Sequence, residues 1–186
     1  MATETSDLEL LAQIGDGDQN AFASLVRRHQ GRVFHLAYRF SRDSQDAEEL
    51  SQEIFFKVWK YARNFQGRAA FSTWLYRLAV NTCLNHRQKK KSAPVPLSLS
   101  GDLAAAAETA GAELIARERE KLLEQAMDAL PVRQKMALVL ANFEGKSYEE
   151  IAAIMEVSVS AVETLLFRAR KNLGKILRPL KNKSAC

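Results

Sequence analysis

The sequence predicts an all-α fold made of two small helical domains joined by a flexible linker. Apolar residues recur at helical spacing through most of the 186 residues, and no segment shows convincing strand alternation. One stretch, residues 92–112, breaks the helical pattern. Hydrophobic residues make up 47% and charged residues 26%, as in ordinary globular proteins. We therefore expect a first domain over residues 1–91, a linker over 92–112 and a second domain over 113–186.

Helical periodicity divides the first domain. Two short helices are expected near the N-terminus, separated at residues 15–17, and a further helical segment follows over 33–40. A longer helix is predicted from Asp46 to Ala62 and another from about Phe71 to Lys90. The short stretch 64–68 between them reads as a loop.

Residues 92–112 contain Pro94, Pro96 and Gly101 but no aromatic and no basic residue. Fully extended, such a linker spans at most about 70–75 Å. As a flexible coil, its ends average roughly 25 Å apart. Either length would let two domains touch DNA one or two turns apart.

The second domain begins with two predicted helices, over 112–130 and 132–143, which Pro131 separates. Residues 147–150 (Ser-Tyr-Glu-Glu) then form a capping box, which starts a third helix. After a short turn at Glu156 and Val157, Ser158 can cap a fourth helix that runs to about Leu173. Two short helices with such a turn and a basic second helix describe a helix-turn-helix.

The charge distribution suits a polyanionic partner. The net charge is +5, composed of +4 in residues 1–91, −2 in 92–112 and +3 in 113–186. Residues 158–183 hold seven basic residues and one acid. Two basic ends joined by a slightly acidic strip favour two separate contacts with nucleic acid.

Two cysteines, Cys83 and Cys186, offer neither a disulfide framework nor a metal spacing. We expect Cys83 to pack as a small apolar residue and Cys186 to be a free thiol. The N-terminal stretch has no basic region followed by an apolar core, so it predicts no signal peptide. No apolar run approaches the roughly 18 residues needed to span a bilayer. These observations predict a cytoplasmic protein without direct membrane insertion.

The helix-turn-helix is the first candidate DNA-binding site. A recognition helix enters the major groove with its first residues nearest the bases, while basic residues further along meet phosphates. The alternative is an ordinary helix pair whose basic face is only solvated; the capping box, turn length and charge bias favour DNA binding. The candidate contacts are Ser158, Ser160, Ala161, Glu163, Thr164, Phe167, Arg168, Arg170 and Lys171.

The helix from Phe71 is the second candidate. Aromatic and amide groups beside cations provide the stacking surfaces, hydrogen bonds and phosphate neutralisation that single-stranded recognition needs. Trp74 and Phe71 also fit a core stripe, which is the competing interpretation for them. In the preceding loop, Phe65 and Arg68 could close a pocket around an unstacked base. The candidate residues are Phe65, Arg68, Trp74, Arg77, Asn81 and Asn85.

The helix from Asp46 is acidic in an otherwise basic chain. Because acids repel DNA, its surface favours a protein partner, with aromatic residues beside charged ones. The competing interpretations are a solvated charged face and a metal site built on Glu49 and Glu53. The candidate contacts are Asp46, Glu49, Gln52, Glu53 and Phe56.

Catalytic constellations are missing from the sequence. The histidines His29, His35 and His86 are scattered, with no cysteine or carboxylate at ligand spacing. There is no phosphate-cradling glycine loop and no G-x-S-x-G motif. We expect no catalytic residue, no metal, no cofactor and no small-molecule substrate.

Three stretches, in order, resemble the extracytoplasmic-function (ECF) sigma factors of bacterial RNA polymerase. Residues 46–55 (DAEELSQEIF) are similar to the helix of that family that docks on the coiled coil of the polymerase beta-prime subunit. Residues 71–81 (FSTWLYRLAVN) are similar to the segment that opens and reads the minus-ten promoter element. Residues 147–170 resemble the helix-turn-helix that reads the minus-thirty-five element. The resemblance covers about residues 8–180.

The resemblance implies a role for each surface. Glu49, Gln52 and Glu53 would contact core polymerase, which the family engages through its beta-prime and beta subunits. Phe65 and Asn81 would bind a flipped non-template base, and Arg77 would support the strand. Thr164, Phe167 and Arg168 would serve the upstream element.

The resemblance also implies partners and regulation. The factor would bind promoter DNA. When free, it would be a monomer. An anti-sigma protein would hold it inactive, and a membrane-anchored one would hold it at the membrane indirectly. Its regulon would answer a stress or envelope signal.

The start of the recognition helix departs from the family pattern. That family often has basic residues in a Thr-Val-Lys/Arg-Ser-Arg run, whereas residues 161–165 here read AVETL. Glu163 could accept a hydrogen bond from a cytosine amino group, whereas arginine would prefer guanine. This predicts a changed upstream preference.

Two other functions fit part of the sequence. A helix-turn-helix repressor or activator would explain residues 147–173 but leaves the patterns at 46–55 and 71–81 as coincidences. It would bind DNA tightly without polymerase, as a dimer on a palindrome. An all-helical enzyme with a metal on the acidic helix would show metal-dependent turnover.

Overall fold

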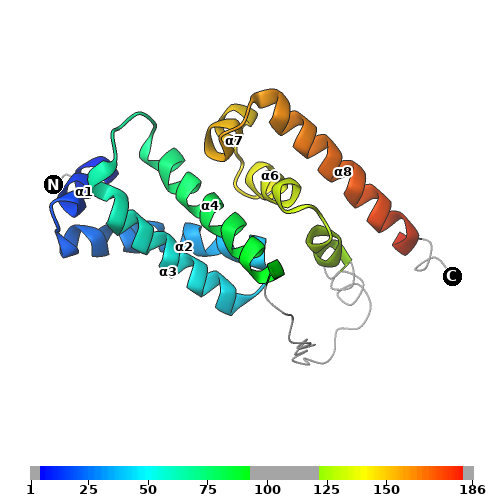
Figure 1. Ribbon diagram of the computed structural model, residues 1–186, viewed down its shortest axis with the longest axis horizontal. Coiled ribbons are helices and arrows are strands. Elements are labelled where there is room, and N and C mark those ends of the chain that lie inside the picture. The colour runs from blue at the N-terminus through cyan, green and yellow to red at the C-terminus, as the bar shows by residue number, and fades with distance from the viewer. Residues whose placement is uncertain (1–4, 93–121, 182–186) are drawn as a thin grey trace, which may run out of the picture.

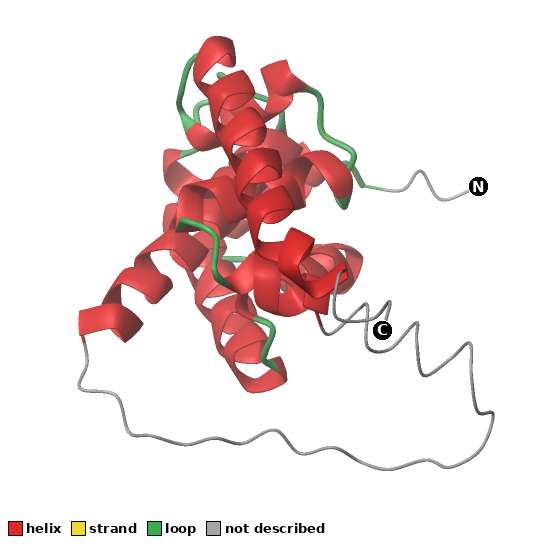
Figure 2. Ribbon diagram, turned by 90° about the vertical axis from the view of Figure 1, so that its right-hand side faces the viewer, coloured by secondary structure: helices red, strands yellow, loops and turns green. Residues whose placement is uncertain are grey.

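The computed structural model describes residues 5–92 and 122–181, and within them it contains helices, turns and loops but no strand (Figure 2). The described helices form two bundles that lie side by side (Figure 1). The first bundle consists of α1 (Asp7–Gly15), α2 (Gln19–Ser41), α3 (Ser44–Tyr61), the 3₁₀ turn η1 (Ala62–Asn64) and α4 (Phe71–Ser92). The second consists of a helical segment over 122–128, then α6 (Val132–Asn142), α7 (Tyr148–Met155) and α8 (Val159–Lys181). The predicted all-α fold is confirmed.

Short polar side chains start the helices of the first bundle. Ser6 forms a capping box with Glu9, whose carboxylate accepts from the Ser6 backbone amide at 2.8 Å. Asp18 caps α2 and Asp43 caps α3 through their side-chain oxygens. At the end of α2, Arg42 adopts a left-handed conformation with φ of 64°, which turns the chain sharply into α3.

Two helices are longer than the sequence suggested. The helical residues around 22–26 and 33–40 belong to one continuous helix, α2, because no proline interrupts them and the exposed Gly31 is tolerated inside it. Helix α8 extends past Leu173 to Lys181. The linker residues 93–112 and the first half of the helix predicted over 112–130 lie outside the described residues, as does Cys186.

The first bundle buries one apolar stripe from each helix. Cys83 is fully buried there, as predicted for a small apolar residue, and burial raises the pKa of its thiol to about 12. A thiol with such a pKa stays protonated and unreactive at neutral pH. The largest fully buried side chains of this bundle are Leu11, Leu25, Leu36, Leu50, Ile54 and Val58.

The second bundle contains the predicted helix-turn-helix. Ser147 and Glu150 form the predicted capping box at the start of α7. Glu156 ends α7 in a left-handed conformation with φ of 55°, and Ser158 accepts from the Ala161 amide at 3.2 Å to cap α8. Ile151, Ile154, Val162, Leu166 and Ala169 close the core between these helices and α6.

None of the helices in the two described ranges is long and apolar enough to cross a membrane.

Replacement of Ser147 by alanine should lower the free energy of unfolding by about 1 kcal/mol, since the first amides of α7 lose their acceptor. Urea denaturation followed by circular dichroism measures this change. Ser147→Asp is the control, because aspartate caps a helix equally well. Equal unfolding midpoints for Ser147→Ala and the wild type would contradict the role of the capping box.

Candidate functional site

Helix α8 presents one polar and basic face to solvent. Its apolar face, with Val162, Leu166 and Ala169 fully buried, packs on α6 and α7. The opposite face carries Phe167, which is 66% exposed. The structure brings the following candidate residues together at the start and on the open side of this helix: Ser158, Ser160, Glu163, Thr164, Phe167, Arg168, Arg170 and Lys171, all exposed, with Ala161 half-buried among them.

Local hydrogen bonds order the first turn of this face. The hydroxyls of Ser158 and Ser160 lie 3.0 Å apart, and the Thr164 hydroxyl donates to the Ser160 carbonyl at 2.9 Å. Glu163 follows this first turn and lies exposed beside Thr164. The positive charge begins one turn later, at Arg168. The face therefore has a polar start followed by cations, the order in which a recognition helix meets bases and then phosphates.

Three aromatic residues, Phe65, Phe71 and Trp74, form a cluster where the loop after η1 meets the start of α4. The Phe65 and Trp74 rings meet edge to face at 5.3 Å between centroids, and Phe71 lies 6.1 Å from Trp74. Phe71 is buried, whereas Phe65 and Trp74 are half-buried. Trp74 therefore fits both the core interpretation and the DNA-binding interpretation, because part of the side chain packs on the core and part is exposed to solvent. This aromatic cluster provides stacking surfaces beside the exposed Arg68.

The polar residues of α4 do not share one environment. Asn81 and Asn85 are exposed one turn apart. Arg77 instead contacts the second bundle: its Nε donates to the Ala153 carbonyl at 2.7 Å, and its Nη1 lies 3.6 Å from the Glu156 carboxylate. Arg77 is therefore engaged by the second bundle, whereas the two asparagines stay exposed, because α4 packs against α7 near Arg77.

A largely buried carboxylate, that of Glu144, joins the two bundles. Arg39 of α2 donates to its Oε1 at 2.9 Å, and the Tyr76 hydroxyl of α4 donates to its Oε2 at 2.7 Å. Only 8% of the Glu144 side chain is exposed. Burial, together with the hydrogen bond to Glu144, raises the pKa of Tyr76 above its ordinary value, so this hydroxyl keeps its proton to donate.

Sequence reasoning missed this contact. Glu144 lies 105 residues from Arg39 and 68 from Tyr76. A pattern with a helical period reports neighbours three or four residues away, so it carries no signal for such a pair.

Helix α3 presents an acidic face with an aromatic residue. Glu49, Gln52 and Glu53 are exposed, and Phe56 is 63% exposed. Asp46 lies apart from them: 17% of its side chain is exposed, and it faces His86 of α4 at 3.6 Å. The structure thus groups four of the five candidate residues on one surface and turns the fifth toward α4.

A wide groove of about 1140 Å³ runs between α2 and α3 beside this surface. Its apolar lining includes Phe22 and Trp59, whose rings meet edge to face at 5.2 Å. Gln52 and Phe56 line the same groove. Exposed acids next to an open apolar groove suit a protein partner better than a polyanion.

The competing metal site on α3 has no support in the geometry. Glu53 pairs with Lys57 at 2.7 Å. Within residues 5–92 and 122–181, no group of three or more His, Cys, Asp or Glu side chains could hold a metal ion.

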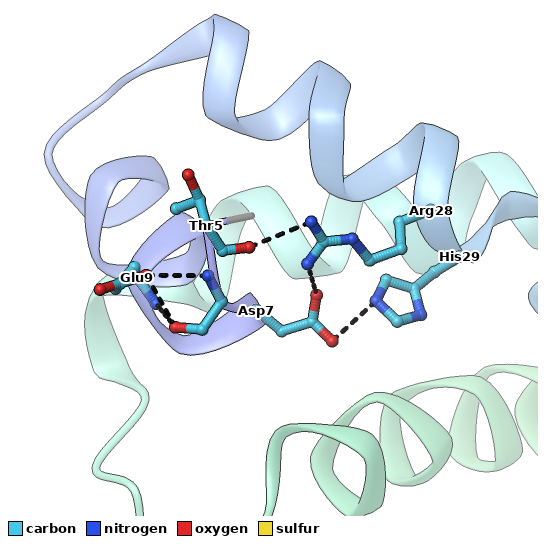
Figure 3. A network of polar contacts seen from close by, with 6 residues as sticks. Thr5, Asp7, Glu9, Arg28 and His29 are labelled. Atoms are coloured by element: carbon cyan, nitrogen blue, oxygen red, sulfur yellow. Dashed lines mark hydrogen bonds and ion pairs between the residues drawn. The ribbon is translucent and has the colours of Figure 1, made fainter. Parts of the chain in front are cut away.

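A second polar network escaped the sequence analysis. Asp7 of α1 lies between two residues of α2: Arg28 Nη1 is 2.5 Å from its Oδ1, and His29 Nε2 is 3.0 Å from its Oδ2 (Figure 3). Arg28 also donates to the Thr5 carbonyl at 3.0 Å. Partial burial alone would raise the pKa of Asp7, but the hydrogen bonds from Arg28 and His29 outweigh it and hold the pKa below its ordinary value.

Two family models match the chain: Sigma-70 region 2 over residues 25–93 and Sigma-70, region 4 over residues 120–173. The chain is 36% identical to the RNA polymerase sigma-H factor of Pseudomonas aeruginosa, over 97% of this chain and 98% of that protein. It is 34% identical to the ECF RNA polymerase sigma-E factor of Escherichia coli strain K12, with the same coverage. The solved structure of CnrH in complex with the cytosolic domain of CnrY matches with a TM-score of 0.66 and 26% identity, over 93% of this chain and 97% of that one.

Replacement of Glu144 by alanine should loosen the contact between the bundles. Charge-assisted hydrogen bonds contribute about 1.5–3 kcal/mol each, and Arg39 and Tyr76 both lose their acceptor. Spin labels at the exposed Lys60 of α3 and Lys175 of α8 would report a longer and broader distance distribution.

The matched control is Glu149→Ala, which removes an exposed acid of α7 and should leave the label distance unchanged. If Glu144→Ala gives the wild-type distribution, other contacts hold the bundles together and the role assigned to Glu144 is wrong.

Proposed function

The chain belongs to the sigma-70 family, in its extracytoplasmic-function group, and from this premise we propose which of its surfaces carries each step of transcription initiation. Sigma factors bind core RNA polymerase and direct it to promoters, and they have no catalytic activity of their own. The chain is therefore an RNA polymerase sigma factor and not an enzyme. Family membership decides against both rival functions, the independent repressor and the metal enzyme.

The exposed face of α8 is proposed to recognise the upstream promoter element. The exposure of this face is the main observation that supports the assignment of surfaces. The apolar side of α8 is buried in the core. Glu163, Thr164 and Phe167 are exposed and would contact base edges. Phe167 is apolar and exposed, which suits contact with a thymine methyl group. Arg168, Arg170 and Lys171 then neutralise phosphates.

The aromatic cluster is proposed to capture an unpaired base of the minus-ten element. Unpairing costs a few kcal/mol, which stacking on Phe65 and Trp74 and hydrogen bonds from Asn81 would offset. Arg68 and Asn85 are both exposed and would meet the strand. Arg77 would join them only after its side-chain contacts with Ala153 and Glu156 break.

The acidic surface of α3 and its groove are proposed to bind core polymerase. Glu49, Gln52 and Glu53 would supply polar contacts, and Phe56 would fill an apolar pocket of the partner. Asp46 would act mainly by orienting the start of α3 against His86. The partner is the polymerase, through its beta-prime and beta subunits.

Regulation by an anti-sigma protein follows from the family. CnrH forms a complex with the cytosolic domain of CnrY. By analogy, this chain would be a cytoplasmic protein, monomeric when free, that a cytosolic anti-sigma domain holds inactive. An anti-sigma protein with a membrane anchor would keep it at the membrane indirectly.

Promoter-dependent transcription tests the core-binding surface. Purified core polymerase and a pool of upstream genomic fragments from the host should give specific transcripts only with this chain. Gln52→Ala should weaken core binding by about five- to thirtyfold, equivalent to 1–2 kcal/mol, because a central interface contact is lost.

The control is Gln13→Ala, an exposed glutamine on α1 that lies outside this surface. If Gln52→Ala and Glu53→Ala both bind core as tightly as Gln13→Ala, the assignment of α3 as the polymerase surface is wrong. If core gains no specificity from the chain, its function as a sigma factor fails as well.

Glu163→Arg should change the preferred base in the upstream element, because arginine selects guanine whereas glutamate accepts from cytosine. Binding-site selection with both proteins in holoenzyme measures the preference at every position. Discrimination between bases of about 1–3 kcal/mol is expected at one position only. An unchanged upstream motif would show that Glu163 does not face a base.

A further inference from the structure

Helix α1 belongs to none of the surfaces assigned above, and it precedes the matched region 2, which begins at residue 25. Its buried residues Leu10, Leu11 and Ile14 join the core of the first bundle. Each end of α1, however, is connected to the aromatic cluster by a short chain of contacts, and the two chains are separate.

The first route starts at Asp7, at the N-terminal end of α1. Its carboxylate holds the His29 ring by the 3.0 Å contact to Nε2 (Figure 3). His29 is only 7% exposed, and its ring lies 5.2 Å from the ring of Phe71. Phe71 in turn contacts Trp74. The position of the Asp7 carboxylate thus determines how His29 supports the inner side of the aromatic cluster.

The second route starts at Gly15, the last residue of α1. A Cβ atom at this position would lie 3.2 Å from the Arg63 Cα, which is tighter than most Cβ contacts, and 3.4 Å from the Arg63 nitrogen, at the edge of ordinary contact. Arg63 belongs to η1. Phe65 is the first residue after η1, and its amide donates to the Ala62 carbonyl at 3.1 Å. Because Gly15 has no Cβ atom, η1 can pack close to α1, and this distance also affects the position of Phe65.

We propose that Asp7 and Gly15 are positioning residues for the minus-ten base pocket: α1 fixes Trp74 through His29 and Phe71, and fixes Phe65 through η1. Stacking of a flipped base requires its walls to be held within a fraction of an ångström before the base arrives. Neither residue touches the DNA. The proposal rests on the assignment of the aromatic cluster to an unpaired promoter base.

The alternative role for α1 is general support of the fold. Its three buried apolar residues would supply that support without any effect specific to the pocket. The two roles differ in one measurable respect. A positioning residue matters only when a base occupies the pocket, whereas a residue that only stabilises the fold matters equally with or without the base.

The experiment uses the full chain in holoenzyme with promoter fragments that carry a premelted minus-ten element. Each non-template nucleotide of that element is replaced in turn by an abasic site, and the position at which wild-type binding falls most is taken as the captured base. Two fragments, intact and abasic at that position, are then bound by Asp7→Ala, Gly15→Ala and the wild type.

The wild type should bind the intact fragment about tenfold more tightly than the abasic one, as expected for the loss of one stacked base. Asp7→Ala and Gly15→Ala should each bind the intact fragment about three- to tenfold more weakly than the wild type. On the abasic fragment they should match the wild type, because residues that act through one contact are non-additive with its loss. Asp7→Asn keeps a hydrogen-bond acceptor for His29 and should restore most of the affinity.

Matched controls come from the same chain. Gly174→Ala places a Cβ where no atom lies within 4 Å, and Leu8→Ala removes an exposed side chain of α1. Both should bind both fragments like the wild type. Gly15→Ala adds a single methyl group and Asp7→Ala removes a partly exposed carboxylate, so two independent variants report on the two ends of α1.

Three outcomes would overturn the proposal, and they are distinguishable. If no abasic position weakens wild-type binding, the base pocket itself is wrong and the proposed function of the aromatic cluster fails. If the pocket is found but both variants bind the intact fragment like Leu8→Ala, the role of α1 is wrong. If both variants lose the same factor on both fragments, α1 only stabilises the fold.

Discussion

Burial of one apolar stripe on each helix is the constraint on which the other features of this protein depend. Each fully buried leucine or isoleucine contributes about 1.5–3 kcal/mol, so the rotation of a helix about its axis cannot change without a large loss. On α8, burial of Val162, Leu166 and Ala169 leaves Glu163 and Phe167 outward. On α3, burial of Leu50 and Ile54 leaves Gln52 and Glu53 outward. The proposed functional surfaces are the faces that the core leaves exposed.

The contact between the bundles combines apolar packing with several polar contacts. The polar contacts include the hydrogen bonds of Arg39 and Tyr76 to Glu144, the hydrogen bond of Arg77 to α7, and an ion pair between Arg42 and Glu124 at 3.0 Å. Loss of one partner of a buried polar contact is costly unless water or another polar group takes its place. The proposed role of Arg77 in promoter binding would require DNA to replace its present contacts with Ala153 and Glu156.

The aromatic cluster combines the two kinds of interaction. Phe71 is part of the core, whereas Phe65 and Trp74 are only half-buried, and their positions depend on neighbours. Trp74 contacts Phe71, whose ring lies beside His29, the partner of Asp7; Phe65 follows η1, whose backbone lies close to Gly15 of α1. If the cluster binds a base as proposed, such supports would hold rings whose positions burial alone does not fix.

The sequence by itself determined the all-α fold, the capping box at Ser147, the helix-turn-helix and the outward faces of α3 and α8. All of these depend on residues within one or two helical turns of each other, where periodicity and capping chemistry can be read directly. Only the tertiary structure decided that α2 is one helix, that Asp46 turns toward His86, and that Arg77 is engaged by α7. It alone revealed the contacts of Glu144 and Asp7, whose partners lie far away in the sequence. Such contacts follow from how helices pack, and no local pattern in the chain encodes the packing of distant helices.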